Sequence, residues 1–179
     1  MNTSEYSFEN FLVGNSNRFA FNAALTVADG FPKKVYNPLL IYGDDQCALE
    51  KTHLVCAIRN SIVKNFPYYR IVCVKLDEFV NELIKSFVQK QMANFYKKYK
   101  GADFLIIEDV QFLRGKFETQ REFYNIFNTL YEHGKQIVFT ADRLPYAMPG
   151  LEDRIRVIFN SCLLANMQSP DDAVCTVSK

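Results

Sequence analysis

Five short apolar runs alternate along the chain with longer segments of helical periodicity. The runs are PLLIY (38–42), RIVCVKL (70–76), FLIIE (104–108), QIVFT (136–140) and SCLLA (161–165). Because their apolar residues do not alternate with polar ones, they are typical of parallel strands covered on both faces. Apolar residues at helical spacing occupy segments 16–29, 51–64, 77–99 and 118–133. The pattern predicts a doubly wound α/β sheet with right-handed crossovers, whose sites lie at the carboxyl ends of the strands.

The composition is that of a single globular domain spanning residues 1–179, with 49% apolar residues and sixteen phenylalanines. The formal charge of +1 gives no global field for nucleic acid or membrane, so such a surface would have to be local. No apolar run has the length of a membrane span, and the first residues do not resemble a signal peptide. We therefore expect a cytoplasmic protein with no membrane partner.

Cysteine and histidine usage predicts no dedicated metal site. The five cysteines form no CxxC pair and are expected to be reduced core residues; they are Cys47, Cys56, Cys73, Cys162 and Cys175. The two histidines, His53 and His133, lie far apart in the sequence.

The stretch IYGDDQCALEKTH (41–53) begins and ends like a phosphate-binding loop. Such a loop has the form G-x-x-x-x-G-K-[ST], because its glycines let backbone N–H groups surround phosphate oxygens. Here Lys51 and Thr52 follow an apolar run and open a helical segment, but Asp45 and Glu50 occupy the expected glycine positions. Gly43 lies two residues too far upstream. Acidic side chains here would repel a polyanion, so the stretch alone is read either as an acidic surface loop or as an altered phosphate loop.

A second acidic feature lies at the end of the third run, where FLIIEDVQF places Glu108 and Asp109 after an apolar strand. This is the form of a Walker B segment, in which the first acid helps to hold Mg²⁺ and the next can orient the attacking water. A strand that ends in solvated acids would look the same. Together with Lys51 and Thr52, however, the pair forms a constellation at the ends of the first and third strands.

The surrounding segments resemble the AAA+ domain of the bacterial chromosomal replication initiator, the DnaA family. The resemblance runs from about residue 5 to about residue 170 and rests on YSFENFLVGNSNRFAFNAALTVA, YNPLLIYG, KTHL, FLIIEDVQFL, GKFETQREFYNIFNTLYEHGKQIVFTADRLP and LEDRIR. It implies a P-loop NTPase core with a five-stranded parallel sheet and helices on both faces. Family members bind ATP, assemble into a filament at the origin and help to open the duplex.

The resemblance also implies roles for single residues. ATP or ADP would be held by Val13, Gly14, Asn15, Gly43, Lys51 and Thr52. Mg²⁺ would be held through the nucleotide by Thr52 and Glu108. The catalytic positions would be Glu108, Asp109 and the sensor 1 residue Asp142.

Three departures from the family pattern affect the ATP machinery. The family loop GGVGLGKT is GDDQCALEKT here, two residues longer and with one glycine. In LEDRIRVIF, Ile158 stands where the family has its arginine finger, and Arg156 would lie roughly 200° around the helix from it. The helical lid and the C-terminal DNA-binding domain are expected to be absent. Since loss of an arginine finger alone slows hydrolysis by several powers of ten, we expect a pseudo-ATPase with weak or no hydrolysis.

A two-helix insertion over about 77–100 is the candidate surface for single-stranded DNA, which the family binds there. Lysines can neutralise phosphates, while the insertion's aromatic residues are expected to be mostly core because of their helical spacing. The segment GKFETQ (115–120) also resembles a DNA-contacting turn, although Glu118 replaces an arginine of some members. The candidate contacts are Lys85, Lys90, Lys97, Lys98, Lys116 and Thr119.

Three functional hypotheses remain open from the sequence. The first is a replication-initiation domain with a degenerate nucleotide site that contacts single-stranded rather than double-stranded DNA. The second is a non-catalytic regulatory paralogue that binds a true initiator, another AAA+ copy or a helicase-loading partner. The third is an active ATP-binding initiator with an unusual phosphate loop.

Overall fold

The chain folds around one parallel sheet in the computed structural model, which describes residues 5–168. Its strands are β1 (Leu39–Tyr42), β2 (Ile71–Lys75), β3 (Phe104–Glu108), β4 (Gln136–Ala141) and β5 (Leu163–Asn166). The sheet order is β2-β3-β4-β1-β5, and every neighbouring pair is parallel. The predicted five-stranded parallel α/β sheet is therefore confirmed.

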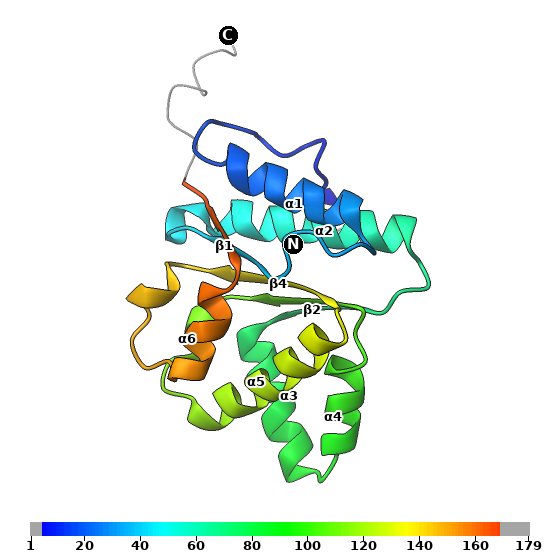
Figure 1. The fold of residues 1–179 in the computed structure, drawn as a ribbon, viewed down its shortest axis with the longest axis vertical. Helices are drawn as coiled ribbons and strands as arrows, with labels where there is room; N and C mark the ends of the chain where they lie inside the picture. Colours follow the sequence, from blue (N-terminus) through cyan, green and yellow to red (C-terminus); the bar gives the residue numbers. More distant parts are fainter. Residues whose placement is uncertain (1–4, 169–179) are drawn as a thin grey trace.

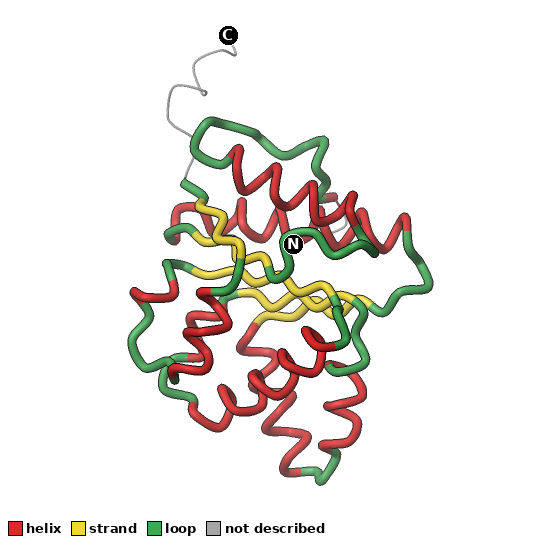
Figure 2. Tube along the Cα trace, viewed as in Figure 1, coloured by secondary structure: helices red, strands yellow, loops and turns green. Residues whose placement is uncertain are grey.

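Helices cover both faces of the sheet (Figures 1 and 2). They are α1 (Arg18–Gly30), α2 (Ala48–Asn65), α3 (Leu76–Val88), α4 (Met92–Tyr99), α5 (Phe117–Glu132) and α6 (Asp153–Asn160). Short 3-10 turns follow three of the strands: η2 (Asp45–Cys47), η3 (Val110–Leu113) and η4 (Pro145–Ala147). The α1 and α2 helices pack on one face, and the other four helices pack on the opposite face.

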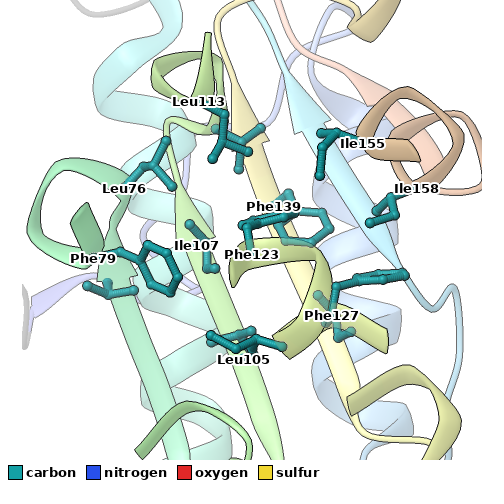
Figure 3. Close-up of a cluster of buried hydrophobic side chains, with 14 of the residues drawn as sticks. Leu76, Phe79, Leu105, Ile107, Leu113, Phe123, Phe127, Phe139, Ile155 and Ile158 are labelled. Atoms are coloured by element: carbon teal, nitrogen blue, oxygen red, sulfur yellow. The ribbon is translucent and has the colours of Figure 1, made fainter. Parts of the chain in front are cut away.

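Side chains that alternate along each strand supply two separate cores. In β3, Leu105 and Ile107 point to the face covered by α3 and α5, whereas Phe104 and Ile106 point to the face of α1 and α2. Figure 3 shows the first of these cores. Every residue of β3 and β4 is buried, which explains why their sequences are continuous apolar runs.

The predicted helical stripe over 77–99 is divided into α3 and α4 by a turn in which Lys90 has a φ of 56°. Its buried members include Phe79, Leu83 and Tyr99. Its aromatics are mostly core, as expected, but Phe87 at the end of α3 is 74% exposed, beside Ile84 at 55% and Val88 at 74%. The α3–α4 pair projects away from the sheet, so no element within residues 5–168 covers this last turn (Figure 1).

The cysteines of the described chain are free thiols. Cys47, Cys56 and Cys162 are buried as expected, Cys73 is half-buried, and Cys175 lies outside the described residues. Among residues 5–168, no helix is both long and apolar enough to cross a membrane.

Candidate nucleotide site

The loop between β1 and α2 is closed by its own hydrogen bonds. The Asp44 carboxylate accepts a hydrogen bond from the Gln46 amide at 3.1 Å, and the Asp44 carbonyl accepts one from the Cys47 amide at 3.1 Å. The Ala48 amide donates to the Asp45 carbonyl. A phosphate cradle needs several successive amides that point at the ligand. In this loop the amides of residues 46–48 are bound inside η2 instead.

Lys51 is buried, with 4% of its surface exposed, in the first turn of α2. Its ammonium group donates to the carbonyl oxygens of Gly43, Asp44 (3.2 Å) and Ala141 (3.0 Å). An ammonium group has three donors, so these three acceptors satisfy it completely. Burial lowers the pKa of Lys51 below its usual value, and the negative charge of Asp109 opposes that shift.

Gly43 is required by the backbone next to it. Its amide donates to the Ala141 carbonyl at 3.2 Å, and the neighbouring Met167 amide donates to the Tyr42 carbonyl at 2.8 Å. A Cβ atom at position 43 would collide with the Met167 backbone carbonyl. The glycine therefore permits the close approach of β1 to the end of β5.

Thr52 and Glu108 come together as expected. The Thr52 hydroxyl donates to a Glu108 carboxylate oxygen at 3.1 Å. Glu108 ends β3 and is 7% exposed, and this burial raises the pKa of its carboxyl group, with Asp109 adding to the effect. A hydroxyl beside a carboxylate suits Mg²⁺, which prefers hard oxygen ligands and is usually shared with a bound phosphate.

Asp109 follows with a left-handed backbone, at a φ of 61°, which aspartate tolerates better than most residues. Its amide donates to the Thr140 hydroxyl at 3.0 Å, and its carboxylate accepts from the Gln111 side chain at 3.4 Å. These bonds connect the ends of β3 and β4. Gln111 also accepts from the Asp142 amide at 3.3 Å and so links both acidic positions.

Asp142 follows β4 and is half-buried, and its carboxylate is paired with its neighbour in sequence. Arg143 donates to the two Asp142 oxygens at 2.8 and 2.7 Å. The two residues border a hollow of about 300 Å³ at the carboxyl ends of β1, β4 and β5. Gly43, Asp44 and Tyr146 also line this hollow. The ion pair with Arg143 offsets the negative charge of Asp142 at the mouth of this hollow.

The segment where the resemblance places adenine precedes α1. Val13 is 42% exposed, Asn15 is exposed and Gly14 is buried. Asn17 was not predicted as a site residue, yet it is fully buried: its side chain accepts from the Gly14 amide at 2.8 Å and donates to the Leu12 carbonyl at 3.0 Å. The only signal for it was an asparagine directly before a helix, a pattern typical of N-caps, yet its side chain makes no capping bond.

His53 was also missed as a positioning residue. Its ring stacks on Tyr6 with 4.5 Å between centroids, and its Nε2 atom lies 2.9 Å from both the Ser7 carbonyl oxygen and the Asn10 side-chain oxygen. These contacts attach the segment before α1 to the helix that carries Lys51 and Thr52. The amino-terminal segment is therefore fixed beside the loop.

The residues fit the two parts of Mg-ATP unequally. Thr52 and Glu108 suit the cation, but the phosphates do not fit the loop in this conformation, since its amides and the Lys51 ammonium group are bound internally. The side chains of Asp44 and Asp45 are exposed at the same place and add negative charge. ATP would have to displace these bonds to bind as it does in an open phosphate loop.

The position at which the resemblance places an arginine finger lies in α6. Ile158 is 4% exposed and belongs to the core shared with Phe159. Arg156 donates to the Leu151 carbonyl of its own chain at 3.2 Å. The side chain at position 158 is therefore packed in the core.

The candidate DNA contacts differ in exposure and in pairing. Lys85 and Lys90 are exposed near the α3–α4 turn, and Lys116 is exposed before α5. Lys98 is bound to both Glu82 oxygens at 2.7 Å, and Lys97 lies beside it. Thr119 is 7% exposed, so its side chain offers little surface to DNA.

Comparison with known proteins identifies the family. A family model described as the bacterial DnaA ATPase domain matches residues 2–166. Domain III of the Thermotoga maritima replication initiation protein DnaA is 42% identical, with a TM-score of 0.88 over 94% of this chain and 69% of that one. DnaA from Aquifex aeolicus with bound AMPPCP is 36% identical, with a TM-score of 0.86 over 92% of this chain.

A DnaA initiator bound to AMPPCP and single-stranded DNA is likewise 36% identical, with a TM-score of 0.85 over 92% of this chain. The chain spans 50% of the length of each of these last two proteins. The DnaC helicase loader, at 14% identity and a TM-score of 0.75, shares the fold. The chain belongs to the family of bacterial DnaA ATPase domains, the AAA+ domains of replication initiators.

Proposed function

We propose that this chain is a replication-initiation domain with a degenerate nucleotide site that hydrolyses ATP weakly or not at all. The observation that carries the proposal is the burial of Lys51, whose ammonium group is fully bound to backbone carbonyls. A phosphate would have to replace these acceptors in a loop that already carries exposed carboxylates. The competition raises the free energy of the nucleotide-bound state.

Two further features support weak hydrolysis. Asp142, the position expected to sense the γ-phosphate, is already paired with Arg143. The buried Ile158 leaves no cation at the position from which a neighbouring copy would receive an arginine finger. The third hypothesis, an active ATP-binding initiator, requires the loop to open and Lys51 to turn outward.

The test is calorimetric titration with Mg-ATP of three proteins: the native chain, Lys51→Ala, and a chain in which GDDQCALEKT (43–52) is replaced by GGVGLGKT. We expect no difference between the first two and binding that is at least about tenfold tighter in the third, since its glycines free the backbone amides. Phosphate release is measured on the same samples. Micromolar binding by the native chain that Lys51→Ala abolishes would instead establish the active-initiator hypothesis.

We further propose that the exposed lysines Lys85, Lys90 and Lys116 contact single-stranded DNA. Support comes from their exposure, from the groove of about 270 Å³ between α3 and α4 that Lys85 lines, and from the related initiator bound to single-stranded DNA. Fluorescence anisotropy of a labelled oligothymidylate tests this. Lys85→Gln/Lys90→Gln should weaken binding and lower its salt dependence, whereas Arg59→Gln on the opposite face should not.

A second candidate function, docking to an initiator or another AAA+ partner, is favoured by a groove of about 410 Å³ between α5 and α6. Val157 and Tyr131 line it and are 68% and 47% exposed. Arg154, whose guanidinium lies 5.2 Å from the centre of the Tyr124 ring, adds a cation at its edge. Co-sedimentation with an intact DnaA tests this candidate: Val157→Asp should abolish binding, while Val63→Asp on α2 serves as the control.

A further inference from the structure

Charge is distributed unevenly along the strand direction, although the net charge is only +1. The carboxyl ends of the strands carry the acidic positions of the nucleotide site. At the opposite side lie the segments 31–37, 66–70, 97–103 and 133–135, three loops and the end of α4 with the loop after it, which we call the amino edge. The amino edge has one acidic residue, Asp103, and seven basic ones: Lys33, Lys34, Arg70, Lys97, Lys98, Lys100 and Lys135. Two of the basic residues are ion-paired, Lys98 with Glu82 and Lys135 with Asp103.

The four segments form one continuous surface. The Phe31 ring contacts those of Phe66 and Tyr69, with centroids 5.2 and 4.9 Å apart. Asp103 accepts hydrogen bonds from the Arg70 amide at 2.9 Å and from the Lys135 ammonium group at 2.6 Å. The Asn37 side chain donates to the Lys135 carbonyl at 2.8 Å. The contacts of Asp103 and Asn37 follow the sheet order, whereas Phe31, buried in the core beneath α1 and α2, reaches the loop before β2 across that face.

Exposed tyrosines accompany the cations. Tyr68 is 99% exposed, Tyr36 is 47% exposed and Tyr69 is 39% exposed. A purely solvated lysine face would account for the cations, and Tyr69 packs on Phe31, but Tyr68 has no packing contact among the described residues. Rings beside cations match a polymer of flat bases on an anionic backbone, because the bases can stack on tyrosine while phosphates meet lysine and arginine.

The amino edge is also hollowed. A groove of about 390 Å³ is lined by Arg70, Val72, Asn94, Lys97 and Lys98, with no acidic side chain. Arg70 is held there by a hydrogen bond of 3.3 Å to the Lys97 carbonyl. Asn94 and Lys98 also line the groove between α3 and α4, so the two grooves meet across α4.

We propose that the amino edge is a nucleic-acid-binding surface selective for single strands, with Lys33, Lys34 and Arg70 on the phosphates and Tyr68 stacking on a base. Single strands are preferred because only unpaired bases present their faces to a side chain. This surface goes beyond the proposed contacts of Lys85, Lys90 and Lys116, since it lies on other loops and does not depend on the nucleotide site.

The test is the anisotropy of a labelled oligothymidylate of about 20 nucleotides, titrated with the full chain at several salt concentrations. Lys33→Gln/Lys34→Gln/Arg70→Gln should bind at least about tenfold more weakly, with a salt slope smaller by about 2, because each phosphate contact to a single strand contributes about 0.7. Tyr68→Ala should bind about tenfold more weakly with an unchanged salt slope, and Tyr68→Phe should bind like the native chain. Circular dichroism confirms that each variant is folded.

Several results overturn the inference. One is native affinity in both the triple variant and Tyr68→Ala. Another is equal binding of a duplex of the same length. Tighter binding to phosphatidylglycerol vesicles than to the oligonucleotide would assign the surface to membranes, and salt-sensitive self-association lost in the triple variant would assign it to a second copy.

Lys85→Gln/Lys90→Gln is measured in parallel, so that the two DNA proposals fail independently. Loss of binding in that variant alone would overturn the amino-edge surface and keep the proposed function. Loss of binding in the amino-edge variants alone would keep the amino-edge surface and overturn the proposed contacts of Lys85 and Lys90.

Discussion

The ammonium nitrogen of Lys51 lies 3.0 Å from the carbonyl oxygen of Ala141 and donates a hydrogen bond to it. The bond joins the first turn of α2 to the last residue of β4. Lys51 is therefore a structural bridge between the loop and the strand that precedes Asp142. Nucleotide binding through this lysine would break that bridge, which is why the same residue governs both stability and the proposed loss of ATP affinity.

Lys51 should make stability depend on alkaline pH. Burial lowers its pKa below the ordinary 10.5, so the unfolded chain binds the proton more tightly than the folded chain does. Stability due to this group should therefore increase as pH rises through the lowered pKa towards about 10.5. We expect the free energy of unfolding of the native chain, measured by urea denaturation relative to Lys51→Met, to rise over this range. If the difference in unfolding free energy between the two proteins is the same at every pH in this range, the lowered pKa of Lys51 is contradicted.

Glu108 should have the opposite dependence. Burial raises its pKa, so the folded chain binds more protons than the unfolded chain between 4.5 and the raised value. Its stabilising contribution is present below that window and is lost as pH rises through it. Glu108→Gln keeps the acceptor for Thr52 but carries no charge.

We therefore expect Glu108→Gln to be more stable than the native chain at about pH 7, with a smaller gain at about pH 4, as measured by thermal unfolding. The matched control is Glu118→Gln, whose side chain is 79% exposed and whose ion pair with Arg121 should contribute less than about 1 kcal/mol. A destabilised Glu108→Gln at neutral pH would show that the carboxylate charge is satisfied in the folded chain.

Gly43→Ala should destabilise the protein in the absence of any nucleotide. The added Cβ would collide with the Met167 carbonyl, and overpacking against backbone costs about 1–3 kcal/mol. The comparison is Gly115→Ala, where φ is 70° but no atom lies within 4 Å, so that only backbone strain of about 1 kcal/mol is expected. Urea denaturation measures both. If Gly43→Ala is the more stable of the two, the close approach of β1 and β5 does not explain this glycine.

The strands and the fold class could be predicted because a parallel sheet buried on both faces imposes continuous apolar runs. The exposure of the last turn of α3 could not be predicted. Helical spacing shows that Phe87 and Val88 share a stripe with Phe79, but it does not show where the opposing surface ends. The burial of a stripe depends on which element lies opposite it, and that is a property of the whole fold.

The site was predictable only in outline. Strand ends place Thr52 next to Glu108 because the carboxyl ends of parallel strands share one edge. The sequence could not show that Lys51 turns towards backbone carbonyls or that Arg143 pairs with Asp142. Both contacts depend on the path of a loop, because a change in one backbone dihedral angle changes the direction of the hydrogen-bond donors that follow it.

Asn17 illustrates the same limit and gives the last prediction. Its buried side chain satisfies the Gly14 amide and the Leu12 carbonyl, which otherwise lack a partner in the described contacts. Leaving a buried donor unsatisfied costs about 1–3 kcal/mol, so Asn17→Ala should lower the free energy of unfolding by about 2 kcal/mol.

The same substitution should also speed hydrogen exchange at the Gly14 amide. Asn15→Ala removes an exposed side chain that, among the described residues, is bound to Arg18 alone, and should change stability by less than about 0.5 kcal/mol. Equal stabilities of the two variants would mean that the segment before α1 is held by its aromatic contacts to His53 rather than by Asn17.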